Sequence, residues 1–172
     1  MKKLKAFRPP DSHHLEAAQG WLELGNHLEA NEELDQITPE LRAHPDVLEL
    51  RWQIYARAQK WDACVDLANA IIKLMPNRAV GWIHRSFALH ALGRTQDAFD
   101  NVLPVAEKFS KEWRVPYNLG CYCAQITRLE ESEAWIKKAI EIDTRAVQQA
   151  SIDDPDLKPL WIYLCGTMWK RE

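Results

Sequence analysis

Two of the four cysteines in this 172-residue chain, Cys121 and Cys123, are separated by one residue, Tyr122. Paired thiolates can bind a metal or exchange electrons. Apolar residues recur three and four positions apart through most of the chain, so this stretch is expected to be helical. Residues two apart on a helix point about 200° away from each other, so one metal ion cannot take both thiolates. The pair therefore predicts two separate packing positions, with only Cys121 of functional interest.

The histidines do not have metal-ligand spacing either. His13 and His14 are adjacent and diverge on a helix, whereas His84 and His90 are six apart. The chain has no Cys-x-x-Cys and no His-x-x-x-His pair to start a zinc site. It also has no Gly-rich phosphate-binding loop. We expect no metal and no cofactor.

Composition limits the classes of partner. Hydrophobic residues make up 47% of the chain and charged residues 27%, and the net charge is −3. The isoelectric point is about 6.1, whereas nucleic-acid binders usually have a basic face. The only basic cluster is the short stretch at residues 1–5, and no apolar run is long enough to span a membrane. We expect a cytoplasmic protein with reduced thiols and with neither nucleic acid nor membrane as a partner.

A period of 34 residues runs through most of the chain. It relates four sets of small or apolar positions, in each of which every member is 34 residues from the next. Two helices fit within one such period. The sets are Ala30, Cys64, Ala98 and Ser132; Ala18, Trp52, Ser86 and Gly120; Leu24, Ala58, Leu92 and Ile126; and Ile37, Ile71, Val105 and Ala139.

The repeats resemble the tetratricopeptide repeat (TPR) family, whose pattern includes Leu-Gly, aromatic residues and small residues at fixed places. Leu24-Gly25 and Leu119-Gly120 supply two copies of its Leu-Gly pair. The resemblance covers roughly residues 11–144. It implies an all-α fold, a right-handed superhelical α-solenoid of about four helix-turn-helix repeats with a C-terminal capping helix. The first helix of each repeat is called A and the second B.

The period predicts boundaries for the whole chain. The expected parts are an N-terminal lead-in at 1–10, repeats at 11–44, 45–78, 79–112 and 113–144, and a C-terminal extension at 145–172. Pro155 is expected near the start of the capping helix, because proline suits a first helical turn. One apolar face is expected on that helix, made by Leu157, Leu160, Trp161, Leu164 and Met168.

Several residues depart from the repeat pattern. Trp52 stands where other repeats have a small residue, and Ala68 stands where that repeat should have a large one. We interpret this as a volume exchange, with Trp52 buried against the Ala68 side. Pro104 is expected to bend the third B helix, Pro39 to lie near the end of the first B helix, and Pro116 to be harmless in the first turn of the fourth A helix.

The resemblance also implies a binding groove, because A helices line the concave face in this family. At the groove positions, side chains are mixed in character, with an apolar centre. Such a surface suits an extended or helical peptide with one or two apolar anchors. The candidate residues are Leu50, Gln53, Arg57, Ile83, His84, Phe87, Arg114, Tyr117, Asn118 and Cys121, with Asp46, Glu49, Val80, His90 and Gln125 at related positions.

These residues predict a non-enzymatic interaction module, an adaptor or scaffold that binds a peptide segment of another protein. A chaperone for a secreted or assembling partner is the main alternative. A homodimer through the C-terminal helix, with Trp161 and Trp169, is a further one. An enzyme that uses Cys121 and His84 is a distant alternative, because it would need a catalytic geometry that the pattern does not indicate.

Overall fold

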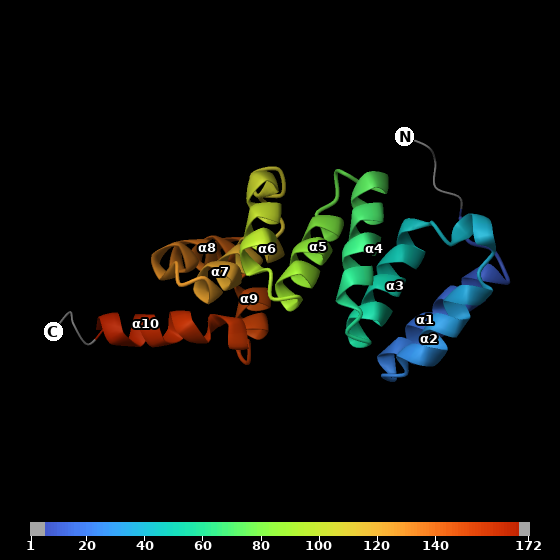
Figure 1. The fold of residues 1–172 in the computed structure, drawn as a ribbon, viewed down its shortest axis with the longest axis horizontal. Helices are drawn as coiled ribbons and strands as arrows, with labels where there is room; N and C mark the ends of the chain where they lie inside the picture. Colours follow the sequence, from blue (N-terminus) through green and yellow to red (C-terminus); the bar gives the residue numbers. More distant parts are fainter. Residues whose placement is uncertain (1–5, 169–172) are drawn as a thin grey trace. The chain divides into compact units, whose positions relative to one another are not determined.

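The structure, a computed structural model, describes residues 6–168, and its regular elements in this range are all helical (Figure 1). This confirms the predicted all-α fold. By its contacts the chain divides after Asn77 into two compact units. Each unit is built from pairs of neighbouring helices.

The N-terminal unit contains two helix pairs. Within each pair the A helix packs on the B helix that follows it. The buried core of this unit takes residues from the first three helices, including Ala18, Leu34 and Leu50. The elements are α1 (Asp11–Glu23), α2 (His27–Gln36), the short 3₁₀ helix η1 (Pro39–Leu41), α3 (Pro45–Arg57) and α4 (Trp61–Leu74).

The C-terminal unit contains two further pairs and an extension. Helix α7 is the most buried element, because α8, α6 and the extension all pack against it. We call residues 144–168 the C-terminal segment. The elements are α5 (Val80–Ala91), α6 (Thr95–Val102), η2 (Leu103–Val105), α7 (Arg114–Gln125), α8 (Leu129–Ile142), α9 (Thr144–Ser151), η3 (Pro155–Leu157) and α10 (Lys158–Met168).

The turn from A helix to B helix is the same in every pair. One residue in each turn has a left-handed backbone, and these residues are 34 apart: Gly25, Gln59, Gly93 and Thr127. The amide after each one reaches back to a helix carbonyl, as in Arg128 N to Cys123 O at 2.8 Å. This is the Schellman arrangement, which satisfies carbonyls at a helix end. The period therefore fixes backbone conformation as well as packing.

Small residues allow the two helices of a pair to approach closely. Ser132 Oγ donates to the Gly120 carbonyl at 2.7 Å, and Cys64 Sγ lies 3.8 Å from the Trp52 carbonyl in the equivalent place. A Cβ on Gly120 would come within 2.6 Å of the Ile136 side chain. The small positions are therefore required by contact between A and B helices.

The irregular residues behave partly as predicted. Pro116 lies in the first turn of α7, and Trp52 and Ala68 are both buried. Pro104 does not bend a continuing helix: α6 ends at Val102 and η2 follows, because proline removes a backbone donor and clashes with the preceding turn. Pro39 lies beyond the end of α2 and begins η1.

The C-terminal segment is two α-helices rather than one. Leu157 and Leu160 are buried as expected, whereas Trp161 is 43% exposed. The side chains of Leu164 and Met168, and the whole of Trp169, lie outside the described residues. Over residues 6–168, none of the helices is both long and apolar enough to cross a bilayer.

Candidate functional site

A pocket opens between the two A helices of the N-terminal unit, α1 and α3. Its volume is about 430 Å³. We call it the N-terminal pocket. Leu50 is only 4% exposed and belongs to the core beneath, and Leu15 packs partly buried against that core. The lining residues are Leu15, Glu16, Gln19, Asp46, Glu49, Leu50 and Gln53.

This pocket gathers predicted groove residues and adds residues that were missed. Leu50 and Gln53 line it, whereas Arg57, exposed at the end of α3, does not. Glu16 was not predicted. It is 34 residues before Leu50, so moving the groove positions back by one period would have found it.

In the C-terminal unit, the corresponding face of α7 is covered. Tyr117 is 6% exposed and Cys121 is 4% exposed. Both belong to a cluster with Leu157 and Leu160 of the C-terminal segment. The expectation that Tyr117 and Cys121 line an open groove is therefore wrong, because the chain's own extension lies on them.

Two aspartates of the C-terminal segment make the polar contacts on this face. Tyr117 Oη donates to Asp154 Oδ2 at 2.6 Å, and Cys121 Sγ lies 3.6 Å from the same oxygen. His90 Nε2 lies 3.0 Å from Asp156 Oδ2. Gln125 Nε2 donates to the Asp156 carbonyl at 2.8 Å. Groove-position side chains thus hold an acidic, non-repeat stretch of chain.

The remaining predicted residues differ in accessibility. Ile83 is buried, Phe87 is 45% exposed, and Asn118 is partly buried. Arg114 is exposed and forms an ion pair with Glu112, with Nε 2.8 Å from Oε1. The hydrogen bond from Arg114 lowers the pKa of Glu112.

Cys121 and His84 lack the electrostatics of a nucleophile and its base. Burial, with Asp154 and Asp156 nearby, raises the pKa of the Cys121 thiol well above its usual range. A reactive thiol needs the opposite shift. Burial, and then the charge of Arg114, lowers the pKa of His84 to about 4. The thiol therefore stays protonated, and the imidazole is a poor base.

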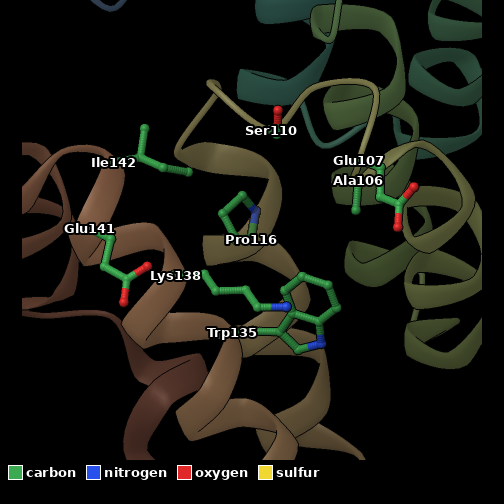
Figure 2. A pocket seen from close by; sticks show the side chains of 8 residues that line it. All are labelled: Ala106, Glu107, Ser110, Pro116, Trp135, Lys138, Glu141 and Ile142. Carbon is green, nitrogen blue, oxygen red and sulfur yellow. The ribbon is translucent and has the colours of Figure 1, made fainter.

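A second pocket, of about 310 Å³, lies between α7, α8 and the turn after η2. Figure 2 shows the Lys138 side chain beside the Trp135 ring, with Pro116 above them. The Lys138 ammonium is 4.1 Å from the centroid of that ring. Across residues 6–168, no group of three or more potential ligands is arranged to hold a metal ion.

Solved structures with the same arrangement of helices are TPR proteins. The TPR protein TTC0263 of Thermus thermophilus superposes with a TM-score of 0.69 at 14% identity, over 78% of this chain and 75% of that one. MamA of Desulfovibrio magneticus RS-1 gives 0.67 at 19% identity, over 81% and 78%. YrrB, described as a TPR protein with an unusual peptide-binding site, gives 0.63 at 17% identity, over 82% and 74%.

The fold of this chain is therefore the tetratricopeptide-repeat fold, as its sequence period predicts. Neighbours with this fold support an interaction module in general terms. No family model matches the sequence, and no curated protein matches it.

Proposed function

We propose that this protein is a non-enzymatic adaptor that binds a peptide segment of another protein on the A-helix face of its N-terminal unit. The observation that carries the proposal is in the other unit. There, Tyr117 and Gln125 at groove positions already hold a non-repeat stretch of chain around Asp154 and Asp156. An A-helix face of this protein thus has side chains suited to holding a peptide.

The N-terminal pocket is the corresponding place where a partner segment can dock. It has a buried apolar base at Leu50, polar side chains at its rim, and room for the side chains of a bound peptide. The YrrB structure, with its unusual peptide-binding site, supports peptide recognition by this fold.

A peptide-display experiment tests the proposal. The full chain is used to select binders from a random peptide library, and selected peptides are measured against a blocked variant, Gln19→Trp with Gln53→Trp. Both glutamines are exposed and line the pocket, so the indoles should fill it without disturbing the core. Gln36→Trp, at an exposed site on α2, is the matched control.

The selected peptides should bind the wild-type chain and the Gln36→Trp variant equally and lose binding to the blocked variant. Equal binding to the blocked variant would place recognition elsewhere and overturn the proposal. A chaperone would instead suppress aggregation of many unfolded proteins without selecting a sequence, and the same variants distinguish the two roles.

A further inference from the structure

The N-terminal pocket is acidic around an apolar base. Three carboxylates line it, those of Glu16, Asp46 and Glu49, and its lining residues include no lysine, arginine or histidine. Glu16 and Asp46 are exposed at the rim. A pocket with this lining attracts positive charge while offering apolar contact to whatever carries it.

The cations of α1 and α3 are engaged on the other side of these helices, toward α2. His14 Nδ1 lies 2.8 Å from Glu33 Oε2, and Arg51 Nη2 lies 2.9 Å from Asp35 Oδ1. In the described part of the chain, Glu16 has no ion-pair partner. The His44 ring lies 3.7 Å from the Asp46 carboxylate. The fold therefore separates charge, with ion pairs toward α2 and an excess of carboxylates at the pocket.

We infer that the N-terminal pocket binds a basic segment of a partner protein, in which a lysine or arginine stands next to an aliphatic residue. This rests on the proposed function and specifies its ligand. The aliphatic residue packs over Leu15 and Leu50. The basic side chain lays its methylene stem along the same apolar surface and carries its charge to Glu16 and Asp46.

The two A-helix faces then select opposite charges. The face of α7 holds the carboxylate of Asp154 through the Tyr117 hydroxyl. An acidic stretch of this kind would be repelled by Glu16 and Asp46 in the N-terminal pocket. The C-terminal segment and an external basic ligand therefore do not compete for one site.

Fluorescence anisotropy of labelled peptides tests this on the full chain. Three probes share one leucine and differ only in charge: Ala-Lys-Lys-Leu-Lys-Ala, Ala-Gln-Gln-Leu-Gln-Ala and Ala-Glu-Glu-Leu-Glu-Ala. Only the lysine peptide should bind, and added salt should weaken its binding because the rim carboxylates are exposed. Glu16→Gln should weaken it roughly fivefold, as expected for one partly screened ion pair.

Glu32→Gln is the matched control, because Glu32 is an exposed glutamate on α2, away from the pocket lining. It should leave affinity unchanged, while Asp46→Asn should reproduce the effect of Glu16→Gln. Circular dichroism of each variant checks that the fold is retained.

Three results would overturn the inference. One is binding of the neutral or acidic peptide as tight as that of the lysine peptide. Another is lysine-peptide binding that survives Glu16→Gln, Asp46→Asn and the blocked variant alike. The third is a dimer of the chain alone, seen in sedimentation and lost with Glu16→Gln, since the occupant would then be a second copy. Selection of neutral peptides by the pocket would overturn the charge preference and leave the proposed function intact.

Discussion

The hydroxyl of Tyr117 on α7 donates to the carboxylate of Asp154, 37 residues later in the chain, at a distance of 2.6 Å. Burial first, and then Asp154, raise the pKa of Tyr117 far above the range in which it would ionise. The phenol is therefore a permanent donor. A permanent donor against a carboxylate gives one of the stronger kinds of neutral-to-charged hydrogen bond.

Tyr117→Phe should loosen the C-terminal segment. Loss of this donor leaves Asp154 without its shortest contact and should lower the free energy of unfolding by about 2 kcal/mol. Hydrogen exchange of the backbone amides between residues 144 and 160 should accelerate. Tyr55→Phe, in the N-terminal unit, is the control and should leave that exchange unchanged; equal exchange in both variants would show that the bond does not hold the segment.

Thr127→Gly should stabilise the protein. Thr127 has φ of 64°, a left-handed backbone that is unfavourable for a β-branched residue. Glycine removes this strain, although it adds freedom to the unfolded chain. The net gain should be about 0.5–1 kcal/mol, measured by urea denaturation.

Gly93→Ala provides the opposite test at the equivalent turn. Gly93 has φ of 76°, and a Cβ there would meet no neighbouring atom within 4 Å. Any loss is therefore a backbone effect, and it should be about 1 kcal/mol. A stabilising Gly93→Ala would show that left-handed strain does not control these turns.

Gly120→Ala should destabilise the fourth helix pair. Alanine is a better helix former than glycine by about 1 kcal/mol, but the added Cβ would come within 2.7 Å of two atoms of the Ile136 side chain. Overpacking of this kind costs about 1–3 kcal/mol, so steric crowding should win. The midpoint of thermal unfolding reports the result. Restoration by the double variant with Ile136→Val would assign the loss to that contact.

His84 should give the stability a specific dependence on pH. The pKa of His84 in the folded chain is about 4, against about 6.5 when unfolded. Only the unfolded chain binds this proton between those values, so its contribution is complete above pH 6.5 and is lost as pH falls toward 4. The loss should reach about 3 kcal/mol, since one pKa unit corresponds to about 1.4 kcal/mol.

Unfolding of His84→Gln, followed in urea between pH 4 and 7, should show a flatter profile than the wild type. His13→Gln, which changes an exposed histidine, is the control and should keep the wild-type profile. A His84→Gln profile that matches the wild type would remove His84 as the cause.

The repeat period predicted what repeats and missed what does not. Ser132 and Gly120 were placed in small columns, and they meet through a hydrogen bond at 2.7 Å. The same period would have led from Leu50 to Glu16, had it been applied to the degenerate first repeat. Residues that each occur once, such as Asp154, have no column.

The burial of Tyr117 and Cys121 followed from such a unique stretch. Their groove positions were assigned from the A-helix pattern, but the C-terminal segment that covers them lies outside the period. Asp153 and Asp154 were interpreted as a helix cap. Asp154 does cap η3, with Oδ1 accepting from the Asp156 amide at 2.9 Å. Its other oxygen makes the contact with α7, which local sequence rules do not describe.

The covered face of α7 also has a consequence during synthesis. A ribosome makes the fourth helix pair before it makes Asp154, Leu157 and Leu160, which complete the cluster around Cys121. For the time needed to add and release this stretch, a nascent chain presents Tyr117 and a thiol that are shielded in the finished fold. Thiol-reactive labelling of stalled nascent chains should therefore mark Cys121 only until the last helix has emerged.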